Sequence, residues 1–533
     1  MEIKINNKSI SLAAPESFLS ILRREQIYFP LYCGGRGTCG KCRIQVTEGS
    51  LPITTEDRAF FSEEELQARF RLGCQAVITA PCSITFEEKQ REKDFYVPSS
   101  QSAGQIFSGK SESKESDRQS AKDKSVKASV ASGSVGQSIA IDIGSTTIVM
   151  VLVHTDSGQI IREYRGLNHQ RSYGTDVMAR IRAAIEDGQG KEMQAIIRQD
   201  LAEGITQLLQ SASEPIEQIV IAGNTTMLHL LRGYDCRGLS AWPFQPVNLD
   251  FEELSTAKLL GESPLVENSL LKETKVTLMA GISAFVGADI TAGLWGCGMT
   301  GNEKPHLFLD LGTNAEMAVG NRKCMIVTSA AAGPAFEGGQ LSCGTGSIPG
   351  AVRDVTVQYG LVRYETIGRR PPVGICGSGI VSAISEMRRS GIMGNDGRLK
   401  GRYASRGLQI VPGKIVITQA DIREYQKARA AIRAGMEILV ENAGYRMEDI
   451  EALELAGGFG SQLDIAKAVG AGLIPEELAD RVHILGNAVI TGLCSYIRCP
   501  DPEGIRSMIR RTRENSLANQ PKFTKSFLEF SCF

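Results

Sequence analysis

A short turn with an acidic residue and a glycine occurs twice in the chain, each time between two apolar segments typical of strands. The first copy is IDIGSTT, beginning at Ile141, and the second is LDLGTNAE, beginning at Leu309. Backbone amides and hydroxyls in such turns suit phosphate oxygens. A single turn of this kind is common in β-hairpins. Two copies a lobe's length apart predict two related α/β lobes that face each other across a phosphate-binding cleft. The predicted phosphate-binding residues are Gly144, Ser145, Thr146, Thr147, Gly312, Thr313 and Asn314.

The carboxylates near the two turns are candidates for the chemistry of this cleft. Asp142 and Asp310 are predicted to face a magnesium ion through its bound water. Together with Glu316 they form the predicted catalytic set. Asp176, Asp289 and Glu316 are the candidate bases, although each is as readily a carboxylate at a helix N-terminus or on the surface. The sequence leaves the choice of base open.

A third glycine-containing segment, LELAGGFG, follows a buried strand near the end of the chain. A backbone without side chains would let an adenine ring lie flat at this place. The alternative is a plain strand-to-helix turn. The residues predicted to contact the adenosine are Gly457, Gly458 and Phe459.

Near the N-terminus, the stretches CGGRGTCGKC and RLGCQA place four cysteines in a C-x5-C-x2-C pattern with a distant fourth. Three soft thiolates in a glycine-rich loop and a fourth from another element are typical of a [2Fe–2S] cluster. A structural zinc site is the alternative, but zinc sites usually pair all their cysteines as C-x2-C elements. Cys82 is a spare thiol. The predicted cluster ligands are Cys33, Cys39, Cys42 and Cys74.

The 533 residues divide by composition and pattern into four regions. Residues 1–97 predict a small α+β unit, with a hairpin at its start and a capping box formed by Ser62 and Glu65. Residues 98–138 are rich in Ser, Lys and Gly and predict a flexible linker. Residues 139–300 and 301–533 predict two α/β lobes, the first with a connecting segment and the second with an insertion that could face a partner.

Bulk properties restrict the function classes. Fifty-nine basic and 60 acidic side chains give a net charge of -1, which argues against a nucleic-acid partner. No export signal or long apolar run is present, so neither secretion nor a membrane span is expected and the 13 cysteines favour the reducing cytoplasm. The five histidines have no metal-ligand spacing.

These motifs carry two resemblances. Residues 1 to about 95 resemble the β-grasp [2Fe–2S] ferredoxins, with the cysteine spacing of the adrenodoxin-like variant. Residues 139 to about 500 resemble the superfamily of sugar kinases, heat-shock chaperone ATPases and actin, whose phosphate 1, phosphate 2 and adenosine motifs match the three glycine-containing segments. The second resemblance implies two ribonuclease-H-like lobes closing over ATP and Mg²⁺, linked by helices at GADITAGL and GNAVITGL.

The whole chain resembles the ATP-dependent reductive activators of corrinoid proteins, through segments such as NHQRSYGTDV, AWPFQP and SAAAGPAFEGGQLSCGTGS. This resemblance implies that the protein passes one electron from its iron–sulfur head to a corrinoid protein of a methyltransferase system, converting cob(II) to cob(I). The system would be, for example, an O-demethylase or the acetyl-CoA pathway. The implied partners are that corrinoid protein and an external donor such as a flavodoxin, ferredoxin or reductase, and a homodimer is expected.

Two other interpretations stay open at this point. The chain could activate another low-potential enzyme, although activators of radical dehydratases carry their cluster ligands within the ATPase core. It could also be a nucleotide-gated electron carrier or regulator without significant turnover. Within the glycine-rich insertion, Ser342 is predicted to approach the corrinoid, with an ordinary lobe insertion as the alternative. Cys343 and Cys376 are expected to be free buried thiols.

Overall fold

The computed structural model describes residues 136–533 and residues 1–86, the latter without residues 7, 26, 28, 30, 32–34 and 39. The predicted linker, residues 98–138, lies outside the described residues as far as residue 135. Strand β8 (Gln137–Ile143) already occupies its last two positions, because Gln137 and Ser138 pair with β9 (Thr147–His154). The first lobe therefore begins two residues earlier than the sequence predicted.

The head, residues 1–86, is a mixed five-stranded sheet crossed by one helix, the predicted β-grasp arrangement. Its strand order is β2-β1-β7-β4-β5, with β1 antiparallel to β2 and parallel to β7. Phe18 and Ile21 of the helix are fully buried against the sheet. The predicted capping box is confirmed, since Ser62 and Glu65 exchange both hydrogen bonds. The elements are β1 (Glu2–Ile5), β2 (Lys8–Ser11), α1 (Phe18–Arg24), β4 (Arg43–Glu48), α2 (Thr55–Phe60), α3 (Glu63–Gln67), β5 (Phe70–Leu72) and β7 (Ser83–Thr85).

The first lobe, residues 136–300, is built on a sheet of order β10-β9-β8-β11-β13-β12. Its first three strands form an antiparallel meander, and β11 and β13 add in parallel. Ile139 and Ile141 of the central strand are fully buried. The remaining elements are β10 (Ile160–Leu167), α4 (Val177–Ile185), α5 (Gly190–Leu209), β11 (Ile216–Gly223), α6 (Thr225–Arg232), β12 (Glu252–Leu254) and β13 (Lys275–Leu278).

The second lobe, residues 301–533, repeats this topology. Its sheet has the order β23-β22-β14-β15-β16-β24, again with an antiparallel meander and two parallel strands. When the added edge strands β12 and β24 are left out, the five remaining strands of each lobe follow the order third, second, first, fourth and fifth from the meander side, so the predicted duplication is confirmed. The strands are β14 (His306–Leu311), β15 (Ala315–Gly320), β16 (Met325–Ala330), β22 (Ala452–Ala456), β23 (Val482–Gly486) and β24 (Thr512–Glu514).

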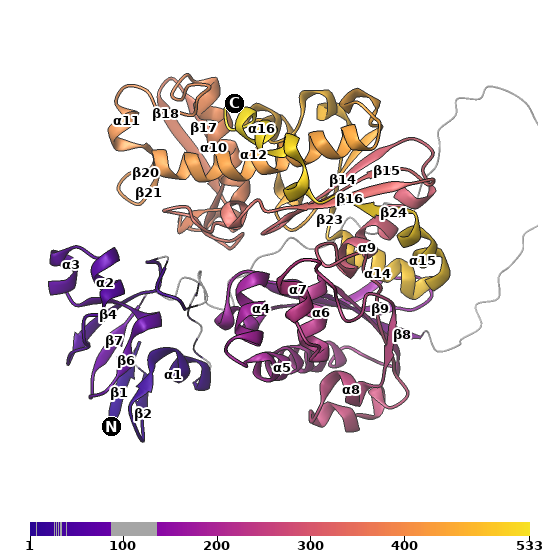
Figure 1. Ribbon diagram of the computed structural model, residues 1–533, viewed down its shortest axis with the longest axis horizontal. Coiled ribbons are helices and arrows are strands. Elements are labelled where there is room, and N and C mark those ends of the chain that lie inside the picture. Colours follow the sequence, from indigo (N-terminus) through magenta and orange to yellow (C-terminus); the bar gives the residue numbers. More distant parts are fainter. Residues whose placement is uncertain are drawn as a thin grey trace, which may run out of the picture.

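The two predicted linking segments are helices α9 (Ala288–Gly296) and α14 (Ala488–Arg498). They cross in direct backbone contact, because a Cβ on Gly492 would lie only 1.9 Å from the carbonyl oxygen of Ala292. The core around them contains buried residues of both sheets, such as Val220 and Phe308. The lobes therefore share one hydrophobic core at the linking helices. Figure 1 shows the head beside the first lobe, with the second lobe above both.

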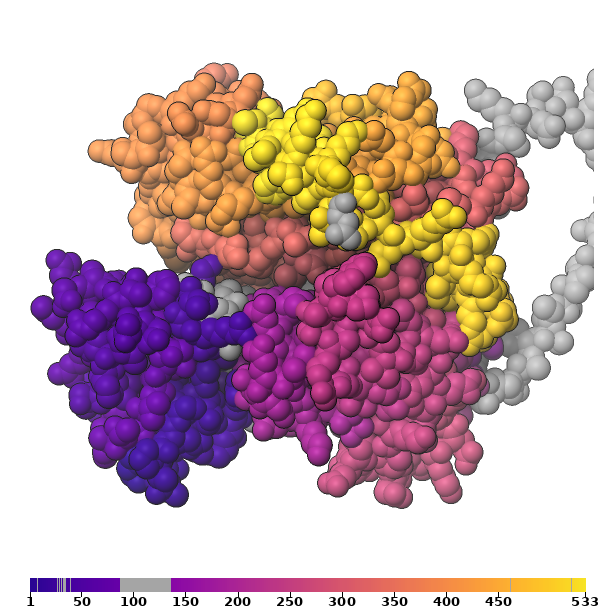
Figure 2. All heavy atoms as spheres, in the orientation of Figure 1, coloured from indigo at the N-terminus to yellow at the C-terminus, as the bar shows by residue number. Residues whose placement is uncertain are grey.

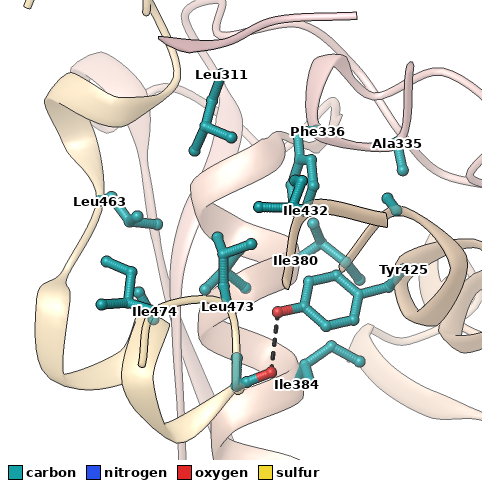
Figure 3. Close-up of a cluster of buried hydrophobic side chains, with 14 of the residues drawn as sticks. Leu311, Ala335, Phe336, Ile380, Ile384, Tyr425, Ile432, Leu463, Leu473 and Ile474 are labelled. Atoms are coloured by element: carbon teal, nitrogen blue, oxygen red, sulfur yellow. Dashed lines mark hydrogen bonds between the residues drawn. The ribbon is translucent and has the colours of Figure 1, made fainter. Parts of the chain in front are cut away.

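The inserted part of the second lobe supports the cleft from behind. It contains β17 (Ala351–Gln358), β18 (Leu361–Thr366) and α10 (Gly377–Arg389), and it precedes the long helix α12 (Gln419–Asn442). Figure 3 shows how Tyr425 of α12 packs among Phe336, Ile380 and Leu473, and its hydroxyl donates to the carbonyl oxygen of Ala471 at 3.1 Å. This core fixes the loop that contains Phe336 beneath the second turn.

Candidate functional site

A single open cavity of about 1870 Å³ brings together nearly all the predicted nucleotide-binding residues. The ends of β8, β14 and β22 converge on it from the two lobes. The groove between the second lobe and the parts below it is visible in Figure 2. The predicted residues that line the cavity are Asp142, Gly144, Ser145, Thr146, Thr147, Asp176, Asp289, Asp310, Gly312, Thr313, Asn314, Glu316, Ser342, Gly457, Gly458 and Phe459.

The first turn is held in shape from behind by the segment that follows β10. The amide of Gly144 donates to the carbonyl oxygen of Thr147 at 3.0 Å. Asn168 donates to the carbonyl oxygen of Gly144 at 2.9 Å, and the fully buried Arg180 donates to the carbonyl oxygen of Ser145. These bonds occupy the carbonyls and leave the turn free to present amides to an anion. Sequence reasoning missed both supporting residues, although they lie within or just after NHQRSYGTDV.

The second turn has the same internal bond, from the amide of Gly312 to the carbonyl oxygen of Asn314 at 2.9 Å. The hydroxyl of Thr313 donates to the carboxylate of Glu337 at 2.7 Å. Burial raises the pKa of Glu337, and the Thr313 hydrogen bond opposes that rise. A phosphate that accepted a hydrogen bond from this hydroxyl would compete with Glu337. The hydrogen bond therefore links the second turn to the glycine-rich insertion.

Four acidic side chains crowd the floor of the cavity. Burial, with repulsion from neighbouring acids, raises the pKa of Asp142 and of Asp310 to about 7. Burial raises the pKa of Asp289 to about 6 and that of Glu316 well above its usual range. Acids held in this way accept a hard divalent cation, which relieves their repulsion. Among the described residues, no group of three acidic, histidine or cysteine side chains is placed to hold a metal ion directly.

Asn487 lies at the N-terminus of α14 and was not predicted. Its side-chain amide donates to the carboxylate of Asp142 at 3.0 Å, while its carbonyl oxygen caps the helix by accepting from Ile490 at 2.9 Å. The bond crosses from the second lobe to the first. Asn487 therefore orients the first-lobe carboxylate and favours its charged form, against the effect of burial.

Asp176 has the structural role that the sequence left open, that of a carboxylate at a helix N-terminus. It is the N-cap of α4, and its carboxylate accepts from the amide of Ala179 at 2.8 Å. Asp289 lies in the first turn of α9 and is close enough to Asp142, Asp310 and Glu316 to raise their pKa values. Geometry therefore favours the Asp289 cluster over Asp176 as the acidic part of the site.

The predicted adenosine segment lines the cavity, and the structure gives its first glycine a steric reason that the sequence did not show. Gly457 has a φ of 94°, and a Cβ there would lie 2.6 Å from the carbonyl oxygen of Leu311 and 2.8 Å from a carboxylate oxygen of Asp310. The glycine is required by close contact with the second turn. Phe459 is 8% exposed and stacks on Phe336 at a centroid distance of 5.1 Å. Its ring is therefore mostly packed into the wall of the cavity.

Ser342 lines the same cavity, and both its amide and its hydroxyl donate to Asp421, at 2.6 and 2.8 Å. Asp421 also caps α12. The prediction that Ser342 faces a corrinoid stays a prediction, because this hydroxyl proton is engaged with Asp421. Cys343 and Cys376 are free thiols, half-buried and buried respectively, and burial raises the pKa of Cys343 to about 11.

Of the predicted cluster ligands, Cys33 and Cys39 lie outside the described residues. Cys42 and Cys74 lie together, with their sulfur atoms 3.1 Å apart. The hydrogen bond from Cys42 lowers the pKa of Cys74 to about 7 against the effect of burial. Gly37 and Gly40 have φ values of 72° and 68°, which turns the loop tightly near them. Two adjacent thiols, one readily ionised, fit a cluster that needs thiolate ligands.

Gln75 was not predicted and holds the cysteine loop against the fourth ligand. Its side-chain amide donates to the carbonyl oxygen of Gly35 at 2.9 Å and lies 3.5 Å from the sulfur of Cys74. Cys82 lies apart from this pair, buried just before β7, where burial raises its pKa. The described part of the head therefore agrees with Cys82 as the spare thiol.

We expect Mg²⁺ to raise the melting temperature more at pH 8 than at pH 6. Because the folded state raises the pKa of Asp142 and Asp310 to about 7, their protonation stabilises the apo fold at acid pH, and this contribution is lost as the pH rises through about 7. Mg²⁺ binds the ionised carboxylates and offsets that loss. Thermal unfolding with and without Mg²⁺ at both pH values checks this. A magnesium effect that does not depend on pH contradicts it.

Three family models match consecutive parts of the chain. They are a 2Fe-2S iron-sulfur cluster binding domain over residues 3–79, the RACo middle region over residues 137–302, and the C-terminal domain of RACo, the ASKHA domain, over residues 304–533. The head is thus a [2Fe–2S] domain. The body is an ATP-binding domain, of a type that usually binds ATP together with Mg²⁺. No helix among the described residues is long and apolar enough to span a membrane.

Relatives with known names resemble most of the chain. Corrinoid activation enzyme RamQ of Eubacterium limosum is 36% identical over 426 residues, which cover 74% of this chain and 70% of the relative. The Co(II) methylated amine-specific corrinoid protein reductase of Methanosarcina barkeri is 26% identical over 373 residues, 66% of this chain and 67% of that protein. A solved reductive activator for corrinoid,iron-sulfur protein shares the fold over 100% of this chain and 98% of its own, with a TM-score of 0.67 and 24% identity. With its iron–sulfur head and two-lobed ASKHA body, the chain belongs to the family of reductive activators of corrinoid proteins.

Proposed function

We propose that the protein uses ATP hydrolysis to drive one-electron reduction of a corrinoid protein, from cob(II) to cob(I), in a methyltransferase system such as an O-demethylase or the acetyl-CoA pathway. The observation that carries this proposal is the joint lining of one cavity by both phosphate turns, the acidic cluster and the segment after β22. The same chain carries the neighbouring thiols of Cys42 and Cys74 in its head. It therefore combines an electron carrier with an ATP-binding body. The names of two relatives, a corrinoid activation enzyme and a corrinoid protein reductase, support this combination.

Energy explains why an electron carrier would be joined to an ATPase. Moving one electron against 100 mV costs about 2.3 kcal/mol. ATP binding and hydrolysis can offset this cost by favouring the arrangement of protein and partner in which the corrinoid is easier to reduce. A plain kinase has no use for the electron, since phosphoryl transfer to a hydroxyl involves none.

The residues of the cleft then have defined roles. The amides of the turns at Gly144 and Gly312 bind the phosphates, and Asp142 and Asp310 hold the waters of a magnesium ion. Bound Mg²⁺ supplies charge neutralisation to the phosphates. Glu316 accepts a hydrogen bond from Ser329 at 3.0 Å, and once a bound cation ionises this acidic cluster, its carboxylate would accept the proton of an attacking water.

In the head, Cys42 and Cys74 together with Cys33 and Cys39 hold the [2Fe–2S] cluster, which supplies a one-electron carrier when bound. Gln75 fixes the loop beside Cys74. The proposed donor to this carrier is a flavodoxin, a ferredoxin or a reductase, and the proposed assembly is a homodimer. Ser342 would face the corrinoid only after its bond to Asp421 opens.

The test mixes the anaerobically purified protein, with its cluster reduced, with a cob(II) corrinoid protein, and follows the absorption of cob(I) with and without Mg-ATP. We expect cob(I) to appear with Mg-ATP and to be absent in the Cys42→Ser variant. Reduction that is indifferent to ATP would favour a nucleotide-gated carrier. No reduction with any of several corrinoid partners would favour another low-potential acceptor.

A further inference from the structure

The head contacts the first lobe through two arginines of its own. Arg23, in the last turn of α1, places its guanidinium 4.4 Å from the ring centroid of Tyr173. Arg36, in the cysteine loop, donates to the carboxylate of Glu186 at 3.2 Å. Glu186 is the C-cap of α4, and Figure 1 shows α1 on the side of the head that faces α4 and α5. Both contacts therefore meet one short segment of the lobe, residues 169–186.

The receiving surface is built as a fixed site. With the head in place Tyr173 is 3% exposed, and within the lobe its hydroxyl donates to Glu192 of α5 at 3.1 Å. Burial, with the negative charge of Glu192, raises the pKa of Tyr173 to about 12, so its ring stays neutral and offers its face to a cation. At both contacts an arginine of the head meets an acceptor of the lobe, which is the Glu186 carboxylate for Arg36 and the Tyr173 ring for Arg23.

The same segment supports the nucleotide site. Asn168, next to this surface, and Arg180, within α4, donate to the carbonyl oxygens of the first phosphate turn. The head itself closes one side of the nucleotide cavity, because residues of its cysteine loop and sheet line it together with both turns. The lining residues of the head include Gly40, Lys41, Arg43, Phe70 and Phe86. In this arrangement the cysteine loop is turned toward the cleft.

We propose that residues 169–186 of the first lobe form a docking site for the iron–sulfur head, with Tyr173 receiving Arg23 and Glu186 receiving Arg36, and that the docked head turns its cysteine loop toward the nucleotide cavity. The site is independent of the corrinoid chemistry proposed above. It gives the head a defined position within its own chain before it meets a partner.

The docking is weak and reversible. Arg36 and Glu186 have side chains 42% and 63% exposed, and an exposed ion pair or cation–π contact changes an equilibrium by roughly two- to fivefold. The head and lobe belong to one chain, so they meet at an effective concentration on the order of millimolar, and weak contacts suffice to populate the docked state. Salt lowers this population, since the pair is exposed.

The test measures the distance from the reduced cluster to a nitroxide, carried by a noncanonical amino acid at the exposed position Lys191, by pulsed dipolar EPR on the full chain without a corrinoid protein. The wild type is expected to show a population at short distance. Glu186→Arg, which changes only the lobe, is expected to reduce that population about two- to fivefold. Adding Arg36→Glu to it is expected to restore the population, because the charges are exchanged.

Arg58→Glu is the matched control for the head substitution Arg36→Glu, since Arg58 forms an exposed ion pair with Glu63 of the head itself. It changes the head's charge equally and is expected to leave the distances unchanged. A distance distribution that is insensitive to Glu186→Arg, or one that the double exchange does not restore, would overturn the docking site. Neither result bears on cob(I) formation, so the docking site and the proposed function fail separately.

Discussion

Replacing Cys74 by Ser is expected to remove the [2Fe–2S] cluster from the head, whereas replacing Cys82 by Ser is expected to leave it in place. Cys74 lies 3.1 Å from Cys42, sulfur to sulfur, and its pKa is lowered to about 7, so it supplies a thiolate beside a second ligand. Cys82 is buried with a raised pKa and has no such neighbour among the described residues. A serine oxygen is a harder ligand than a thiolate and holds the iron of a cluster less well.

The measurement is the visible absorption of the purified variants with their iron and sulfide content, followed by EPR after reduction. If Cys74→Ser loses the cluster while its body stays folded, Cys74 is needed for the cluster and not for the fold of the ATPase body. A Cys82→Ser protein without a cluster would mean that the ligand set differs from the one proposed. Zinc in place of iron in the wild type, isolated without oxygen, would restore the structural-zinc alternative.

The lobes could be predicted because each level of the sequence indicates the same structure. Apolar segments around IDIGSTT and LDLGTNAE predict the two meanders, and the helices and strands after them recur in the same order. Apart from the edge strands β12 and β24, both sheets have the same order of five strands. Local signals such as the Ser62 capping box were equally direct, since cap and partner lie three residues apart.

The parts that were missed depend on contacts between distant segments. Asn487 donates a hydrogen bond to Asp142, which lies 345 positions away in the sequence. No local sequence pattern predicts that pair. Arg180 is a fully buried cation, whose place under the first turn is specified by tertiary packing. Gly457 was predicted from its motif for contact with a base, which stays a prediction, while its steric need at the Asp310 turn became visible only in the structure. A motif can thus identify a residue without identifying its physical cause.

Asp310→Asn is expected to lower ATP-dependent corrinoid reduction and ATP hydrolysis by roughly 100-fold or more, since it removes a charge that the metal and the transferring phosphoryl group require. Asparagine keeps the shape, so the turn at Gly312 and its contact with Gly457 are retained. The apo variant should be at least as stable as the wild type at pH 8. Burial raises the pKa of Asp310 to about 7, so ionising it there opposes folding.

The control is Asp176→Asn, which also lies in the cavity but caps α4, a role that asparagine fills equally well. Its turnover should stay near that of the wild type. ATP hydrolysis, cob(I) formation and thermal unfolding at pH 8 are measured for both variants. If Asp310→Asn keeps its turnover, the acidic cluster is not the metal site; if it loses turnover and stability together, its effect is structural. Lost turnover with retained stability assigns Asp310 to the chemistry of the cleft.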